Sequence, residues 1–248
     1  MSKTVSSKGK DLQKIRVIVV EPKNPGNLGA IARLMKNFGL SDLTVVNISR
    51  IPSEDQFRAM KGKEILSRMK MVNTLEEAIV GLNVVVGTSG IKTESTKGVL
   101  RNYITPAEFS KEMSKIKGSV GIVLGREDNG LTNDELSLCD FFVHIDSSDE
   151  YPILNVSSAA GIIFYELSKT RKGRRKEVTR REDFDLLVDR FRKNLENIGY
   201  PPHRIAKTTL LFRRVISRAL ISPYENRVLM GALDCSRLVE SQKGSRQK

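Results

Sequence analysis

One stretch of the chain decides the fold class: residues 15–46, which read IRVIVVEPKNPGNLGAIARLMKNFGLSDLTVV. Its first apolar run, residues 15–20, is short, continuous and β-branched, and it predicts a buried strand. Residues 24–40 open with an Asn-Pro-Gly turn and then space their apolar residues at helical intervals. A second apolar run, residues 43–46, predicts the next strand. This order predicts two parallel strands joined by a crossover helix.

The same alternation of strands and helices continues as far as residue 168. Further strands are expected at residues 83–87, 119–125 and 141–145. Helices are expected at residues 53–70, 74–81, 105–116, 132–139 and 155–168. The pattern predicts an α/β fold with a mainly parallel sheet that helices cover on both faces.

Arg33 stands apart from the apolar stripe of its own helix. Helical spacing gathers five apolar side chains on one side, those of Leu28, Ile31, Ala32, Met35 and Phe38. Arg33 points roughly the opposite way. By periodicity alone, Arg33 is a solvent-exposed helix residue.

Beyond residue 180 the pattern is helical only. Helices are expected at residues 184–198 and 204–220, with a break at Tyr-Pro-Pro, and a capping box in SPYE, residues 222–225, opens a third. The predicted divisions are a disordered basic tail (1–13), the α/β domain (14–170), a basic linker (171–181) and a helical RNA-binding extension (182–248). Residues 241–248 are also expected to be disordered.

The charge of the chain points to a polyanionic partner. The formal net charge is +13, and residues 169–181, KTRKGRRKEVTRR, hold eight Lys or Arg against one Glu. Such a run is typical of a solvated linker, and it can also contact phosphates. A basic face on the tail is expected from Lys207, Arg213, Arg214 and Arg218. Nucleic acid is the commonest partner for such an excess.

Several classes of protein are disfavoured. No apolar run is long enough to span a membrane, and the first residues lack the apolar core of a signal peptide, so a cytoplasmic protein without a membrane partner is expected. The chain has two histidines and two distant cysteines, so no metal site is expected. It has neither a P-loop nor a Gly-x-Gly-x-x-Gly after the first strand.

Three polar segments rich in glycine or serine follow predicted strands. They are residues 87–90, 125–130 and 146–158. Ligands of parallel sheets bind beyond the carboxyl ends of the strands. Glycine lets the backbone approach a ligand, so together the segments predict a cofactor pocket.

Three segments in order carry a family resemblance: NPGNLGAIARLMKNFGL (24–40), GIVLGREDNGLTNDEL (121–136) and YPILNVSSAAGIIFYEL (151–167). They resemble the three motifs of the SPOUT-class (SpoU/TrmH-like) RNA methyltransferases. The chain is most similar to the TrmJ-type tRNA (cytidine/uridine-32-2′-O)-methyltransferases, which also carry a C-terminal helical extension.

The resemblance implies a fold and a function. The expected fold is the SPOUT α/β knot, with a C-terminal trefoil knot whose loops bind S-adenosylmethionine and a homodimer packed through the knot region. The expected activity is 2′-O-methylation of tRNA at nucleotide 32 of the anticodon loop. Two alternatives stay open: a SPOUT 2′-O-methyltransferase acting on rRNA or another tRNA position, and a non-catalytic RNA-binding protein of this fold.

The resemblance also implies residue roles. The cofactor-binding residues it implies are Thr88, Ser89, Gly90, Gly125, Ile145, Pro152, Ile153 and Leu154. The catalytic residues it implies are Asn27, Arg33, Glu127 and Asn155, with Ser157 in support. Related enzymes often have serine where this chain has Ile153. Arg33 is expected to project into a site shared with the partner subunit. Glu127 is expected to orient Arg33 or its own loop, or to be a helix-start residue.

Overall fold

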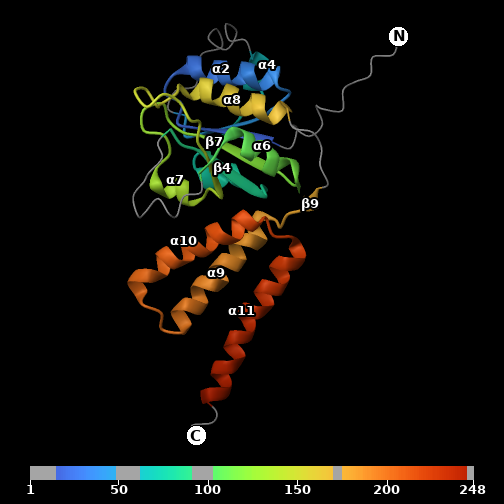
Figure 1. Ribbon diagram of the computed structural model, residues 1–248, viewed down its shortest axis with the longest axis vertical. Coiled ribbons are helices and arrows are strands. Elements are labelled where there is room, and N and C mark those ends of the chain that lie inside the picture. Colours follow the sequence, from blue (N-terminus) through green and yellow to red (C-terminus); the bar gives the residue numbers. More distant parts are fainter. Residues whose placement is uncertain (1–14, 49–61, 91–102, 170–174, 245–248) are drawn as a thin grey trace, which may run out of the picture.

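The computed structural model describes residues 15–48, 62–90, 103–169 and 175–244. Figure 1 shows an α/β part with a unit of three helices below it, from which α11 projects away. The strands are β1 (Ile15–Val20), β2 (Asp42–Val46), β3 (Lys70–Val72), β4 (Val84–Thr88), β5 (Tyr103–Ile104), β6 (Ile116–Lys117), β7 (Val120–Leu124), β8 (Phe141–Val143) and β9 (Lys176–Glu177). The helices are α2 (Pro25–Asn37), α4 (Lys63–Leu66), α5 (Leu75–Ile79), α6 (Pro106–Ser114), α7 (Asn133–Ser137), α8 (Val156–Lys169), α9 (Arg181–Asn197), α10 (Pro202–Ala219) and α11 (Pro223–Gly244).

The predicted parallel sheet is confirmed. Seven strands lie in the order β3-β2-β1-β7-β4-β8-β5, and every neighbouring pair is parallel. Successive side chains of a strand point to opposite faces. Val17 and Val19 therefore join the core under α2, α4, α6 and α8, whereas Ile18 and Val20 join the core under α5 and α7. Burial on both faces explains why β1 is a continuous apolar run.

Helix α2 begins and packs as its sequence predicts. Asn24 caps it by accepting a hydrogen bond from the Gly26 amide at 2.8 Å, and Pro25 occupies the first turn. Four members of the predicted stripe are fully buried, while Phe38 is half-buried beyond the last turn. Arg33 is exposed, as its place on the helix requires.

Of the two helices expected between β2 and β4, the second is confirmed as α5, capped by Thr74, whereas the first differs. Of the helix expected at residues 53–70, positions 53–61 lie outside the described residues. The rest holds only the short α4, and Lys70 already belongs to strand β3. β3 pairs with the open edge of β2, and backbone hydrogen bonds to that edge replace those a longer helix would make.

The helical unit has a small core of its own. Phe184, Leu187, Val188 and Ile221 are buried together, and Phe191 stacks on Phe212 with ring centroids 4.0 Å apart. Residues 241–244, expected to be disordered, belong to α11, while 1–14 and 245–248 lie outside the described residues.

The end of the predicted basic linker is built into the fold. Strand β9 pairs with β6, and Val178, Thr179 and Arg181 are buried. The Arg181 guanidinium donates to Asp140 at 3.0 Å, an ion pair with both side chains about 5% exposed. This part of residues 171–181 is therefore not a solvated arm, because its backbone and one of its arginines attach the helices to the α/β part.

The expected basic face of α10 is also partly wrong. Arg214 is buried, donates to the Leu136 carbonyl at 3.2 Å and lies over the Phe142 ring. Arg213 is paired with Asp185. Only Lys207 and Arg218 of the four are exposed.

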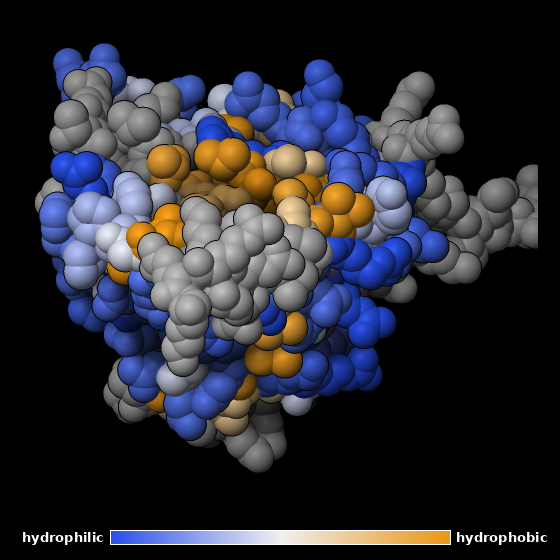
Figure 2. Space-filling model, turned by 90° about the horizontal axis from the view of Figure 1, so that it is seen from below, coloured by the Kyte–Doolittle hydropathy of each residue, from blue (hydrophilic) through white to orange (hydrophobic). Residues whose placement is uncertain are grey.

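The surface of the helical unit is not uniformly polar. Figure 2, seen from the side of the helices, shows apolar side chains gathered among hydrophilic ones. The exposed large apolar residues of the unit are Leu186, Ile198, Leu211, Val215, Tyr224 and Val228.

Candidate active site

A cavity of about 460 Å³ lies at the carboxyl ends of β4, β7 and β8. Its size suits a small-molecule ligand. All eight residues expected to bind the cofactor line it: Thr88, Ser89, Gly90, Gly125, Ile145, Pro152, Ile153 and Leu154. The structure therefore brings together three segments that are far apart in the sequence.

The walls of the cavity combine apolar side chains with turning backbone. Leu131, Leu136, Val143 and Ile163 supply apolar surface, and the segment 125–130 supplies glycine-rich backbone. Such a lining suits a flat aromatic ring attached to a polar sugar, because the ring needs apolar contact and the hydroxyls need hydrogen-bond partners.

The first cavity segment is held by two side chains. The Thr88 hydroxyl donates to the Val123 carbonyl at 3.0 Å, so it links β4 to β7. Nδ1 of His144 lies 3.0 Å from the Ser89 carbonyl oxygen. Because a carbonyl only accepts, Nδ1 carries the proton in this contact. These contacts fix the backbone that faces the cavity.

Four of the five expected catalytic residues form one chain of hydrogen bonds. The Asn27 amide donates to the Glu127 carboxylate at 3.0 Å. The Asn155 amide donates to the Asn27 carbonyl oxygen at 3.1 Å, and Asn155 Oδ1 accepts from both the amide and the hydroxyl of Ser157. The chain joins the second motif to the starts of α2 and α8.

Glu127 is held as an anion at the start of α2. Burial opposes its ionisation, but hydrogen bonds from Asn27 and from the backbone amides of Lys23 and Asn24 outweigh burial and lower the pKa of Glu127. A carboxylate held in this way accepts hydrogen bonds and is a weak base. Among the described residues, the hydrogen bonds of the Glu127 carboxylate go to the start of α2 and none goes to Arg33.

Arg33 lies outside this chain of hydrogen bonds. It is exposed on α2, it is not among the cavity-lining residues, and it has no ion pair or hydrogen bond within the described residues. Among the described residues the Arg33 guanidinium therefore has no side-chain partner.

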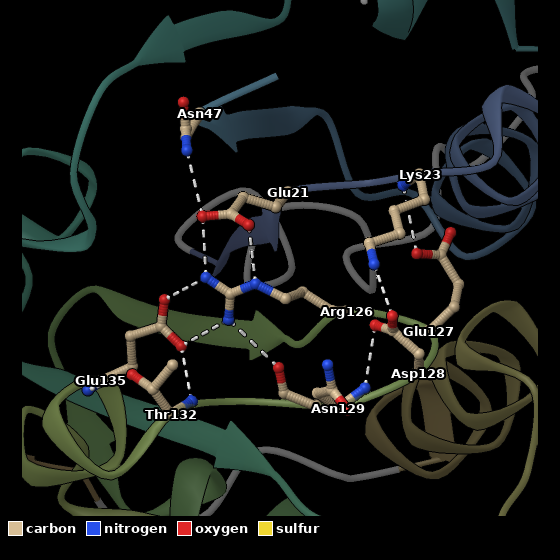
Figure 3. A network of polar contacts seen from close by, with 10 residues as sticks. Glu21, Lys23, Asn47, Arg126, Glu127, Asp128, Asn129, Thr132 and Glu135 are labelled. Atoms are coloured by element: carbon tan, nitrogen blue, oxygen red, sulfur yellow. Dashed lines mark hydrogen bonds and ion pairs between the residues drawn. The ribbon is translucent and has the colours of Figure 1, made fainter. Parts of the chain in front are cut away.

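Sequence reasoning missed Arg126. Figure 3 shows its side chain pointing between Glu21 and Glu135, while Glu127 and Asp128 turn towards Lys23. Each carboxylate accepts two hydrogen bonds from the guanidinium, at 2.8–2.9 Å. The capping box Thr132–Glu135 is readable in the sequence, but the pairing with Glu21, which is far away along the chain, is not.

The described residues contain no group of three or more His, Cys, Asp or Glu side chains placed to hold a metal ion. None of their helices combines the length and apolar character needed to cross a membrane.

Comparison with known proteins decides the family. Residues 14–165 match the SpoU rRNA Methylase family. The chain belongs to the SpoU methylase family. The expected resemblance to SPOUT-class enzymes is therefore confirmed, as is the α/β fold with C-terminal helices, and the chain is a methyltransferase.

Relatives of this SpoU methylase extend the likeness over nearly the whole chain. A tRNA (cytidine-2′-O-)-methyltransferase TrmJ of Methanocaldococcus jannaschii is 40% identical over 88% of this chain and 97% of its own. A tRNA (cytidine/uridine/adenosine-2′-O-)-methyltransferase TrmJ of Pseudomonas aeruginosa is 33% identical over 95% and 96%. The crystal structure of TrmJ from Z. mobilis is 26% identical and superposes with a TM-score of 0.74, covering 90% of this chain and 98% of that one. The family match ends at residue 165, so these likenesses also include the helical unit.

Proposed function

We propose that this SpoU methylase is an S-adenosylmethionine-dependent tRNA 2′-O-ribose methyltransferase that acts at nucleotide 32 of the anticodon loop. The likeness to TrmJ enzymes over nearly their whole length carries the proposal, because it includes the helices outside the family match. The resemblance to TrmJ-type enzymes is what suggests nucleotide 32. The trefoil knot, the homodimer and the cytoplasmic location belong to the same proposal.

The cavity fits the cofactor in size and chemistry. Apolar walls around Ile145, Ile153 and Leu154 suit an adenine ring, and the backbone at Ser89, Gly90 and Gly125 suits its polar groups. When bound, S-adenosylmethionine supplies an electrophilic methyl group. The residues of this chain hold it and exclude water from the cavity.

Methylation of a ribose needs help at the acceptor oxygen. The 2′-oxygen gains a methyl group and loses its proton, and a hydroxyl is a poor nucleophile at neutral pH. A guanidinium can fork onto a ribose phosphate and stabilise the charge that develops on the oxygen. We assign this role to Arg33 and propose that it acts in the site of the partner subunit. The reason is that Arg33 has no contact with the hydrogen-bonded catalytic residues of its own subunit.

The proposed RNA surface lies on exposed cations of the helical unit. Arg204, Lys207 and Arg227 are exposed and have no ion pair within the described residues. Cations of this kind gain affinity for RNA by displacing counterions from its phosphates.

A second candidate is 2′-O-methylation of rRNA or of another tRNA position. The name of the matching family, SpoU rRNA Methylase, favours this candidate. The identity of the methylated nucleotide separates this candidate from the first.

One experiment tests the two candidate functions. The protein is incubated with methyl-labelled S-adenosylmethionine and either unmodified tRNA or rRNA, and the methylated nucleotide is mapped by mass spectrometry. A matched tRNA already 2′-O-methylated at nucleotide 32 is the control. We expect label in the unmodified tRNA only. Label in the control tRNA or in rRNA would contradict the assignment of the nucleotide, and no label in any RNA would contradict the enzyme.

A further inference from the structure

Arg126 has an unusual number of partners for a single side chain. Nε and Nη2 donate to the two oxygens of Glu21, both at 2.8 Å, and Nη1 and Nη2 donate to Glu135, both at 2.9 Å. Nη1 also lies 3.3 Å from the Gly130 carbonyl oxygen. The guanidinium is 13% exposed and forks onto two carboxylates at once.

These partners belong to separate parts of the fold. Glu21 directly follows β1, Glu135 lies in the first turn of α7, and Arg126 and Gly130 belong to the loop 125–130. Glu21 and Asn47 both have a left-handed backbone, with φ of 43° and 47°, and the Asn47 amide donates to Glu21. Such conformations are costly for residues other than glycine and persist where surrounding contacts enforce them. Hydrogen bonds from Arg126 and Asn47 lower the pKa of Glu21 to about 2, so the carboxylate stays charged.

The loop that Arg126 anchors turns back on itself. The amides of Arg126 and Gly130 each donate to the carbonyl of the other at 3.1 Å, and Gly130 is left-handed with φ of 63°. The next residue, Glu127, faces the opposite way and contacts the start of α2. The loop is thus held from both sides, by Arg126 on one and Glu127 on the other, and its backbone lines the cavity.

We propose that Arg126 is a positioning residue for the cofactor: it holds loop 125–130 against β1 and α7 in the shape that forms the cavity wall. The proposal rests on the proposed function, since it concerns S-adenosylmethionine in that cavity. Arg126 acts through the loop backbone and through the placement of Glu127. A lysine cannot replace it, because an ammonium group has no planar fork to span two carboxylates.

The test measures S-adenosylmethionine binding by calorimetry in the full chain. Arg126→Lys keeps the charge, and Arg126→Met removes it. In both variants we expect the dissociation constant to rise about tenfold or more, because the loop loses the contacts that order it. The matched control is Arg16→Met. Arg16 is the second residue of β1, and its side chain is 19% exposed. It donates to Asp42 and to the Ala78 carbonyl, but it lies at the amino ends of the strands.

Two outcomes would overturn the proposal at this stage. One is wild-type cofactor affinity in Arg126→Lys, which would mean that the charge alone suffices. The other is an equal loss of affinity in Arg16→Met, which would mean that general destabilisation explains the effect. Failure of the proposed function looks different, because the wild-type protein would then bind no cofactor at all.

A double variant separates positioning from charge compensation. In Arg126→Met/Glu21→Gln one of the two facing carboxylates is neutral, so the repulsion left by the lost arginine is relieved. We expect the melting temperature to recover towards that of the wild type while cofactor affinity stays low. Low affinity supports the proposal even if the melting temperature does not recover, because Arg16→Met shows the loss due to instability alone. Recovery of wild-type affinity would overturn it.

Discussion

Single residues set the shape of the cavity. At Gly125 the surrounding backbone leaves no space for a side chain. A Cβ at this position would lie 2.5 Å from the Gly130 carbonyl carbon and 2.8 Å from the Leu131 nitrogen. Both neighbours are backbone atoms, so neither can move aside without opening the loop. Gly125 is thus required by the way the loop folds on itself, in addition to its place in the wall of the cavity.

The first prediction is that Gly125→Ala weakens cofactor binding while the fold survives. The displaced loop loses one or two hydrogen bonds, which corresponds to a loss of affinity of about tenfold. Calorimetry measures the affinity and circular dichroism the fold. Gly231→Ala is the control, because a Cβ there meets nothing within 4 Å. Unchanged affinity in a folded Gly125→Ala protein would place the cofactor elsewhere.

The second prediction concerns Arg33. Arg33→Ala removes an exposed side chain without a partner in the described residues, so the melting temperature and cofactor affinity should stay as in the wild type. Turnover should fall by about a hundredfold or more if Arg33 stabilises the transition state. Lys36→Ala is the control, since Lys36 is exposed on the same helix and pairs with Glu64 on the surface. Equal turnover in the two variants would contradict the role.

A mixing experiment tests whether the site is shared. Heterodimers of Arg33→Ala with a folded variant that cannot bind cofactor contain one intact site if Arg33 acts across the interface. We expect activity to return on mixing. No recovery, once subunit exchange is demonstrated, would place Arg33 in the site of its own chain.

At the scale of elements, one chain of hydrogen-bonded side chains links the starts of helices α2 and α8. Asn24 and Asn27 belong to the start of α2, and Asn155 lies just before α8, where its side chain accepts from the Ser157 amide at 2.8 Å. The Asn27–Asn155 hydrogen bond crosses from one helix to the other. Asn155 therefore both caps α8 and fixes it relative to α2.

The third prediction separates these two tasks. Asn155→Ala should lower the free energy of unfolding by about 1 kcal/mol, because a cap is lost. Asn155→Asp keeps a capping oxygen at the positive end of the helix and should restore most of that stability. Both variants lack the donor to Asn27, so turnover should fall in both, by roughly tenfold to a hundredfold. Urea unfolding and methyl transfer assays measure the two effects. Wild-type turnover in Asn155→Asp would show that the link between the helices is dispensable.

At the scale of the whole molecule, the helical unit and the cavity lie at opposite ends of the strands. The Asn83 amide, just before β4, donates to the carbonyls of Val178 and Thr179, whereas the cavity lies beyond the carboxyl end of β4. Val178 and Leu220 also belong to the main core under the sheet. Deleting the helices would therefore open that core and confound any measurement of RNA binding. Surface charge variants avoid this difficulty.

The fourth prediction uses such variants. Neutralising Arg204, Lys207 and Arg227 to Gln should weaken tRNA binding and make log affinity less steep against log salt. Each lost phosphate contact should reduce the slope by about 0.7 to 0.9. Cofactor affinity should not change. Arg192→Gln, which removes a cation already paired with Asp189 and Glu196, should alter the slope less. Equal slopes in the triple variant and the wild type would leave RNA binding to the α/β part alone.

The sequence by itself determined the elements and their order. Continuous apolar runs predicted the central strands, and apolar spacing predicted α2 and α9, because burial imposes a period along the chain. A capping box predicted the start of α11. The ends of the strands predicted where a cavity would form, and the eight expected residues line it. Short edge strands such as β3 were not predictable, because pairing with a neighbour rather than local pattern creates them.

Only the tertiary structure decides which arginines are exposed, paired or buried. Arg33, Arg126, Arg181 and Arg214 all look like solvated cations in the sequence. Arg33 is exposed, Arg126 is held between two carboxylates, and the other two, in α9 and α10, are buried against the α/β part. The partners of Arg126 and Arg181 include Glu21 and Asp140, which are distant in sequence. Charge carries no period along the chain, and an ion pair depends only on distance in space. The packing of the sheet against the helices therefore decides which arginine is available to a ligand, which one positions the loop 125–130 and which ones attach the helical unit.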